Sequence, residues 1–120
     1  MTTLTIEKPP TQPVSEWFPA LEEQEILLGF LALDARNVHV AGEFNDWNAD
    51  ATPLMNAGLG EWVVPLMLRA GRYEYCFVVD GKWIDDPEAA QRVANPHGGF
   101  NSVLIVPLAV RTWPYDHSDF

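Results

Sequence analysis

Three side chains in this 120-residue sequence have the chemistry of a sugar-binding site: Trp47, Trp83 and Asn101. A flat indole ring offers its face to the C–H-rich side of a sugar, and each tryptophan stands beside polar residues. The asparagine amide has both donors and an acceptor for hydroxyl groups. Two indoles side by side would bind a glucan. The alternatives are that Trp47 covers the core, that Trp83 closes the edge of the fold, and that Asn101 only finishes a turn.

Metal and acid–base chemistry lack their usual residue patterns. The histidines, His39, His97 and His117, lie far apart and form no pair at the spacing that zinc sites use, so we expect no metal site. Asp85 and Asp86 are adjacent and would point to opposite faces of a strand, whereas glycoside hydrolysis needs two carboxylates that face each other. We therefore interpret these aspartates as turn residues.

Nucleophilic and phosphate-binding chemistry are equally unsupported. Cys76 is the only cysteine, and its strand neighbours Glu74 and Val78 disfavour a thiolate, so we predict a plain surface thiol. A single cysteine forms no internal disulfide, which agrees with a reducing compartment. Gly98 and Gly99 precede a predicted strand rather than a helix, unlike a phosphate-binding loop. We expect no cofactor.

Composition favours one globular domain and limits its partners. The sequence is 48% hydrophobic and 20% charged, which is ordinary for a soluble domain, and its formal net charge is −10. That charge opposes binding to nucleic acid or to an anionic membrane, because both need clustered lysine and arginine. Residues 1–10 contain no apolar signal-peptide segment, and no apolar run is long enough to span a bilayer. The expected location is the cytoplasm.

The first tryptophan is expected at the end of a strand. Val38 and Val40 belong to an alternating pattern that is typical of a half-buried strand. Gly42 marks a bend or the close approach of a neighbour, and Asn45 belongs to a pair of residues that favour turns. The pattern predicts that Trp47 lies at the tip of a loop.

A second pair of strands positions Cys76 and Trp83. One face of the strand over residues 73–79 is aromatic and is expected in the core, which leaves Cys76 on the outer face. Asp80 and Gly81 form the strongest hairpin signal in the sequence, since a type I′ turn needs positive φ at both central positions. Trp83 then begins the return strand.

The remaining elements complete an all-β chain. Residues 26–33 are expected to form a first strand that pairs as a hairpin with the strand beginning at Val38. Pro65 places its strand at a sheet edge or at a bulge, because proline cannot donate to a ladder. Residues 85–95 are expected to form a loop, and residues 102–106 the last strand. This pattern favours an immunoglobulin-like sandwich of antiparallel strands without the cysteine pair of antibody domains.

We expect three regions along the chain. Residues 1–25 form a proline-rich N-terminal arm with one short helical turn after Pro19, residues 26–106 the sandwich, and residues 107–120 an aromatic C-terminal tail.

Several separated motifs, in the right order, resemble the family 48 carbohydrate-binding modules. This family includes the glycogen-binding domain of the AMP-activated protein kinase β subunit and the N-terminal domains of isoamylase-like and branching enzymes. The similarity covers about residues 26–106 and implies an early-set immunoglobulin-like sandwich that binds glycogen, starch or maltooligosaccharides without catalysis. The residues that carry it are Gly42, Phe44, Asn45 and Trp47, then Gly60, Trp62, Gly71, Tyr73, Tyr75 and Phe77, then residues 79–83, Asp86, Pro87 and residues 95–103.

The resemblance also assigns roles to single residues. Trp47 and Trp83 stand where the family's glucan-stacking tryptophans stand, and Asn101 where its sugar-bonding asparagine stands. Cys76 stands where the kinase-type domains carry a sugar-contacting lysine. Lys82 is the nearest substitute donor, provided that the hairpin turn aims it at the site. The family's enzymes keep their catalytic acids on a separate barrel domain, so we expect no enzyme activity.

We therefore expect a free-standing, non-catalytic module that binds α-glucans weakly, because a thiol replaces a lysine at the site. The alternative is a protein-interaction domain that kept the sandwich and docks a partner through its arm or its tail.

Overall fold

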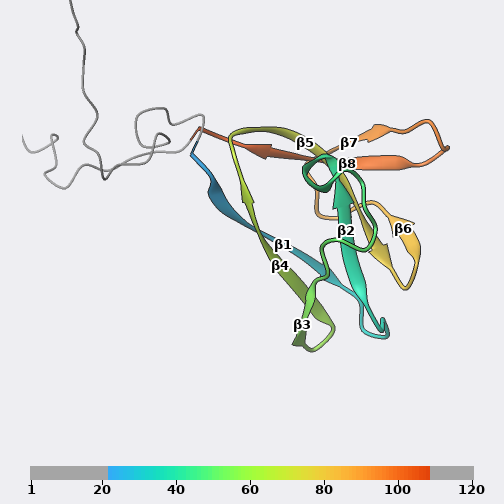
Figure 1. Cartoon of the computed structure of the whole chain (residues 1–120). Coiled ribbons are helices and arrows are strands. Elements are labelled where there is room, and N and C mark those ends of the chain that lie inside the picture. The colour runs from blue at the N-terminus through green and yellow to red at the C-terminus, as the bar shows by residue number, and fades with distance from the viewer. Residues whose placement is uncertain (1–21, 109–120) are drawn as a thin grey trace, which may run out of the picture.

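The computed structural model describes residues 22–108, which form two antiparallel sheets packed as a sandwich (Figure 1). The fold class is as the sequence predicts. The predicted helical turn after Pro19 and most of the arm and the tail lie outside the described residues. Within them no helix is long and apolar enough to cross a membrane. In chain order the elements are β1 (Gln24–Leu31), β2 (Val38–Gly42), the 3₁₀ turn η3 (Glu43–Asn45), β3 (Met55–Gly58), β4 (Glu61–Leu68), β5 (Gly71–Val79), β6 (Lys82–Ile84), β7 (Gln91–Ala94) and β8 (Phe100–Val106).

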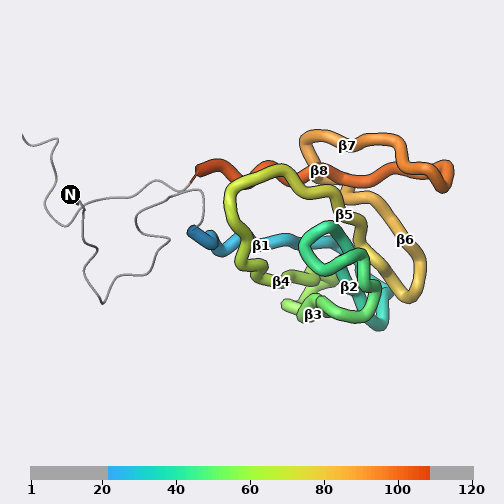
Figure 2. Tube along the Cα trace, turned by 45° about the horizontal axis from the view of Figure 1, so that its top comes forward, coloured from blue at the N-terminus to red at the C-terminus, as the bar shows by residue number. Residues whose placement is uncertain are grey.

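The two sheets share the strands unequally. One sheet has the order β1-β4-β3, and the other has the order β2-β5-β8-β7, with β6 pairing β5 as well. One edge of β5 therefore serves two partners. β8 pairs it from Gly71 to Tyr75, and β6 pairs it from Phe77 to Val79. Figure 2 shows β6 and the β7–β8 hairpin on the side of β5 away from β2. Cys76 lies between the part of β5 that pairs with β8 and the part that pairs with β6.

The core lies between the sheets and follows the alternation of the strands. Every second residue of β4 is buried, from Trp62 to Leu68, and the aromatic face of β5 points inward. The Phe77 ring lies 4.9 Å from that of Phe30 and 5.8 Å from that of Tyr75. The buried cluster contains Leu28, Val38, Val40, Leu54, Trp62, Val64, Leu66, Leu68, Tyr75, Phe77 and Val106. The predicted inner faces of β2 and β5 are confirmed.

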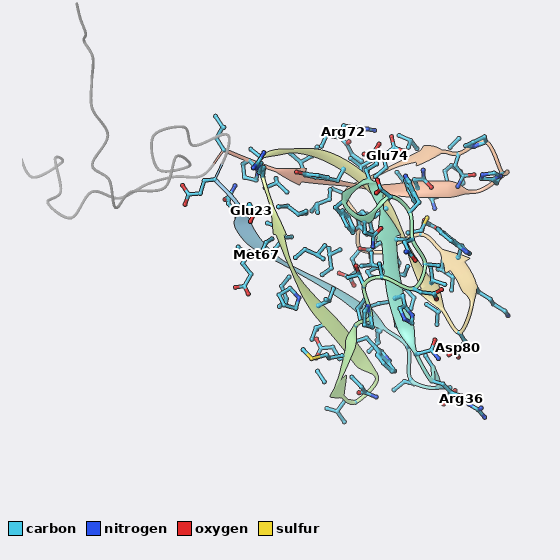
Figure 3. The ribbon with its side chains drawn as sticks, viewed as in Figure 1. Glu23, Arg36, Met67, Arg72, Glu74 and Asp80 are labelled. Carbon is cyan, nitrogen blue, oxygen red and sulfur yellow. The ribbon has the colours of Figure 1, made fainter. Side chains whose placement is uncertain are left out.

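The predicted hairpin between the first two strands is wrong. β1 pairs with β4, whereas β2 pairs with β5 in the opposite sheet. The connection from β1 to β2 crosses between the sheets, and the hairpin between β5 and β6 binds its backbone: the Asp80 carboxylate accepts the amide protons of Arg36 and Asn37, at 2.9 and 3.0 Å. Figure 3 shows Arg36 and Asp80 together at this end.

Pro65 does not lie in an edge strand, since β4 is the middle strand of its sheet. Its ladder is nevertheless one-sided at the proline. Leu27 of β1 is opposite Pro65, but β3 begins at Met55, which is opposite Val63. The missing proline N–H therefore requires no partner from β3.

The segment predicted as a loop over residues 85–95 contains a short strand, β7, which pairs with β8. Its sequence, Gln91–Ala94, has no alternation of apolar and polar residues because both of its faces are largely exposed. The strand exists through its ladder with β8, and local sequence does not reveal that ladder.

Cys76 lies on the predicted face of β5 but is not a surface thiol. Only 4% of the residue is exposed. Its Sγ atom lies 3.4 Å from the carbonyl oxygen of Phe100, at the start of β8, and 3.5 Å from Oδ1 of Asn101. The strand that follows the β7–β8 turn thus covers an outer face that the sequence pattern leaves open.

The outer face of the three-stranded sheet is apolar and exposed. Leu27 and Pro65 are opposite each other, Met67 follows on β4, and Met55 lies opposite Val63 on β3. Leu27, Met55 and Met67 are each more than half exposed. This face lies on the opposite sheet from Cys76.

A buried polar network fastens the segment that links β6 to β7. The hydroxyl of Tyr75 donates to Oδ2 of Asp86 at 2.6 Å, and the amide of Asp86 donates to Oγ of Ser102 at 2.6 Å. All three residues are buried. Burial and the Asp86 carboxylate both raise the pKa of Tyr75. Asp86 is therefore a buried structural anchor, and it is also the predicted turn residue, since its Oδ1 accepts the amide proton of Glu88 at 2.8 Å.

Tyr75→Phe should lower the free energy of unfolding at neutral pH by roughly 1 to 3 kcal/mol, because it leaves a buried carboxylate short of a donor. The raised pKa of the folded state means that the contribution of Tyr75 is complete below about pH 10 and is lost as the pH rises further. Urea denaturation at pH 7 and pH 10.5 should show the difference between parent and variant shrinking.

Tyr73→Phe is the matched control. Its hydroxyl donates to an exposed carbonyl, that of Arg69 at 2.7 Å, so the loss should stay within about 0.5 kcal/mol. Equal losses for the two variants would contradict a special role for the Tyr75–Asp86 contact.

Candidate functional site

A pocket of about 760 Å³ opens where β8 and β6 meet along the edge of β5. Trp47, Cys76, Trp83 and Asn101, which lie far apart in the sequence, all line it. The other lining residues are Asp85, Asn95, Pro96, His97, Gly99 and Phe100. Four of the five predicted site residues therefore meet in one place.

Trp47 is held by a tightly bonded turn. Oδ1 of Asn45 accepts the amide proton of Gly42 at 3.0 Å, and its Nδ2 donates to Val40 and to Thr52, both at 2.9 Å. The amide of Trp47 donates to the carbonyl of Gly42 at 2.9 Å. All polar atoms of the Asn45 side chain are thus used to hold this turn.

The backbone at Trp47 is strained. Asp46 and Trp47 both have positive φ angles, 57° and 58°. Such a conformation is uncommon for any side chain and unusual for a bulky one, and strain of this kind gathers at functional sites. The strained turn brings the indole to the pocket.

Gly42 permits the close packing behind this turn. A Cβ atom there would lie 2.7 Å from the carbonyl oxygen of Glu74 and 2.8 Å from Cβ of Tyr75. The backbone of Gly42 is extended, with φ of −167°, so the requirement is space rather than conformation. The sequence predicts either a bend or a close neighbour at Gly42, and the close neighbour is β5.

Trp83 reaches the pocket from the hairpin between β5 and β6. Asp80 and Gly81 have φ of 49° and 85°, as the predicted turn requires. Trp83 is opposite Val78 and is 51% exposed, so it does not close the core. Lys82 alternates to the other face of β6 and does not line the pocket.

Asn101 is bonded on both sides. Its Nδ2 donates to Oε1 of Glu74 at 3.0 Å, and its Oδ1 accepts from Nδ2 of Asn95 at 3.1 Å. The residue does more than finish a turn, since its amide joins β5 to the loop between β7 and β8. The hydrogen bond from Asn101, together with that from Arg72, lowers the pKa of Glu74.

The thiol of Cys76 forms part of the pocket wall. Burial raises its pKa, and the negative charge of Asp85 raises it further. A protonated, buried thiol is a weak nucleophile, as the sequence predicts, although the causes are burial and Asp85 rather than the strand neighbours Glu74 and Val78.

Sequence reasoning missed part of the wall. Asp85 lines the pocket and forms an ion pair with Arg92 at 3.1 Å, and the Arg92 guanidinium lies 4.5 Å above the Phe100 ring. The sequence pattern predicts Asn95 only as the end of a loop. Its position before the Pro-His-Gly-Gly turn was the available signal, because asparagine commonly caps such turns with its side chain.

The pocket is suited to non-covalent recognition of a polar ligand that has apolar faces. It combines two indoles with amide, carbonyl and carboxylate groups. Within residues 22–108 no three histidine, cysteine or acidic side chains come together as metal ligands.

Comparison with known proteins supports this interpretation. The family model "Glycogen recognition site of AMP-activated protein kinase" matches residues 31–110. The chain is 35% identical over 71 residues to the chloroplastic protein PTST of Arabidopsis thaliana, covering 58% of this chain and 25% of that protein. It is 36% identical over 71 residues to human 5'-AMP-activated protein kinase subunit beta-2, covering 59% and 25%.

A third relative is longer still. The 1,4-alpha-glucan branching enzyme GlgB of Salinibacter ruber is 35% identical over 95 residues, which is 73% of this chain and 15% of the enzyme. Among solved structures, the maltogenic amylase from S. marinus shares the fold with a TM-score of 0.60 and 20% identity, over 71% of this chain and 14% of that one. The chain thus spans a quarter or less of these proteins. The family match covers most of the sandwich, and the chain belongs to the glycogen recognition family, the family 48 carbohydrate-binding modules.

Proposed function

We propose that this protein binds α-glucans such as glycogen or maltooligosaccharides in the pocket at the junction of β6 and β8. The observation that carries the proposal is that Trp47 and Trp83, which are distant in sequence, line the same pocket as Asn101. Indole faces supply the stacking surface, and the asparagine amide supplies directional hydrogen bonding. Family membership supports the same class of ligand.

The proposed binding is weak. Cys76 contributes a buried thiol to the wall, which is a poorer donor than the lysine that the kinase-type domains carry. Lys82 offers no replacement, because it lies outside the pocket lining. Losing one bond from a charged donor costs about one to two decades of affinity, so we expect a Kd on the order of 0.1 to 1 mM for maltooligosaccharides.

The proposed function is binding without hydrolysis. Glycoside hydrolysis uses two carboxyl groups that flank the scissile bond. Among the described residues, Asp85 is the one acidic side chain in the lining, and it is paired with Arg92. Its neighbour Asp86 is buried against Tyr75. Residues 22–108 therefore place no pair of facing carboxylates in the pocket.

Trp83→Ala and Trp47→Ala should each abolish retardation of the protein by glycogen in affinity electrophoresis, since each removes a stacking surface. Trp83 is largely exposed, so its loss should leave the fold intact. Met55→Ala, on the outer face of the other sheet, is the matched control and should migrate like the parent.

Retardation of the 120-residue chain by itself would support a free-standing module. Unchanged migration of the parent in glycogen would contradict α-glucan binding and leave a protein-interaction function, for which the exposed apolar face of the β1-β4-β3 sheet is the available surface. Binding that is indifferent to Trp83→Ala would mean that the site lies elsewhere.

Cys76→Lys should tighten maltoheptaose binding by about tenfold in calorimetry, because it returns a charged donor to the pocket wall. Cys76→Ser is the control for loss of the thiol and should stay within about twofold of the parent. Weaker binding by Cys76→Lys than by Cys76→Ser would refute the explanation of low affinity.

A further inference from the structure

The side chain of Asn95 has only one orientation that satisfies its neighbours. Its Oδ1 atom receives the backbone amides of His97, at 2.9 Å, and of Gly99, at 3.0 Å. A backbone N–H can only donate, so the oxygen must face this loop and the NH₂ group must face away from it. That NH₂ group lies 3.1 Å from Oδ1 of Asn101.

The orientation of Asn101 follows from that of Asn95. Because Asn95 donates, Asn101 must turn its oxygen toward it, and its NH₂ group then faces Oε1 of Glu74 at 3.0 Å. A carboxylate only accepts, so this second contact is satisfied as well. Glu74 is held in turn by Arg72, at 2.9 Å between Oε2 and the guanidinium, and Figure 3 shows the two side chains together.

The same bonds determine what Asn101 has left for a ligand. Its oxygen is contacted by Asn95 and by the Cys76 thiol, and one of its two N–H groups is given to Glu74. Within the part of the chain that the structure describes, the second N–H of Nδ2 is the group of this side chain that has no partner. Asn101 therefore meets the pocket as a hydrogen-bond donor.

We propose that Asn95 and Glu74 are positioning residues of the glucan site, which hold the amide of Asn101 from both sides and present one N–H to a sugar oxygen. This inference rests on the proposed function of the pocket. From the backbone amides of His97 and Gly99 to the carboxylate of Glu74, each donor in this network faces an acceptor. Pre-organisation of this kind raises affinity because binding does not have to order the amide.

Asn95→Asp separates the orientation effect from support of the loop. Aspartate keeps an oxygen for the two loop amides, but it turns a second oxygen toward Oδ1 of Asn101. The NH₂ group of Asn101 can then face either the introduced carboxylate or Glu74, and the other carboxylate is left without a donor. We expect maltoheptaose affinity to fall about tenfold, with the melting temperature within a few degrees of the parent.

Glu74→Gln supplies the test by rescue. The single variant should bind within about threefold of the parent, because glutamine still offers Asn101 an acceptor oxygen. In the Asn95→Asp background the glutamine NH₂ can donate to a reversed Asn101, so the network is satisfied again. Affinity should then return to within about threefold of the parent, since a sugar hydroxyl donates as well as accepts.

The side-chain amide signals of Asn101 in nuclear magnetic resonance spectra of the free proteins give a readout that needs no sugar. We expect one slowly exchanging pair in the parent and in the double variant, and fast exchange in Asn95→Asp. Three results would each overturn the positioning role. The first is fast exchange in the parent, and the second is maltoheptaose binding by Asn95→Asp within twofold of the parent. The third is a double variant that binds no better than Asn95→Asp. Absence of glucan binding by the parent would instead overturn the proposed function. The amide signals would then still show whether Asn95 and Glu74 hold the Asn101 amide in one orientation.

Discussion

The sharing of one edge of β5 between two strands is the constraint on which the rest of the structure depends. β8 pairs with the first half of that edge and β6 with the second, so neither strand forms ladder hydrogen bonds with Cys76. The pocket opens at this interruption, where the start of β8 brings Asn101 and the hairpin before β6 brings Trp83. A regular sheet that continued one strand along the whole edge would leave no such gap.

Two aspartates hold the segments on either side of β6, the strand that borders the gap in the edge of β5. Asp86 ties the segment after β6 to the core through Tyr75 and to β8 through Ser102. Asp80 ties the hairpin tip to the crossing between β1 and β2 through backbone amides. The contact between Tyr75 and Asp86 is buried, and buried polar groups are costly to leave unbonded, whereas the Asp80 contacts are exposed.

The walls of the pocket are held more firmly than their exposure suggests. Asn45 uses its whole side chain to hold the turn before Trp47, and Asn95 does the same for the loop before Asn101. Phe100 is covered on one side by Arg92. A site assembled from loops can thus be pre-organised, provided that side-chain amides replace the ladder bonds that loops lack.

The sequence by itself determined the fold class, the inner faces of β2 and β5, and the hairpin at Asp80, because alternation and turn chemistry are local properties. It also singled out the two tryptophans that line the pocket. Only the tertiary structure decided that β1 pairs with β4 and that Cys76 is buried. A period of two tells which face a side chain occupies, but it does not tell which strand lies alongside or which loop covers that face. The role of Asn95 was hidden for the same reason: its partner, Asn101, lies on a strand whose pairing with β7 no local pattern revealed.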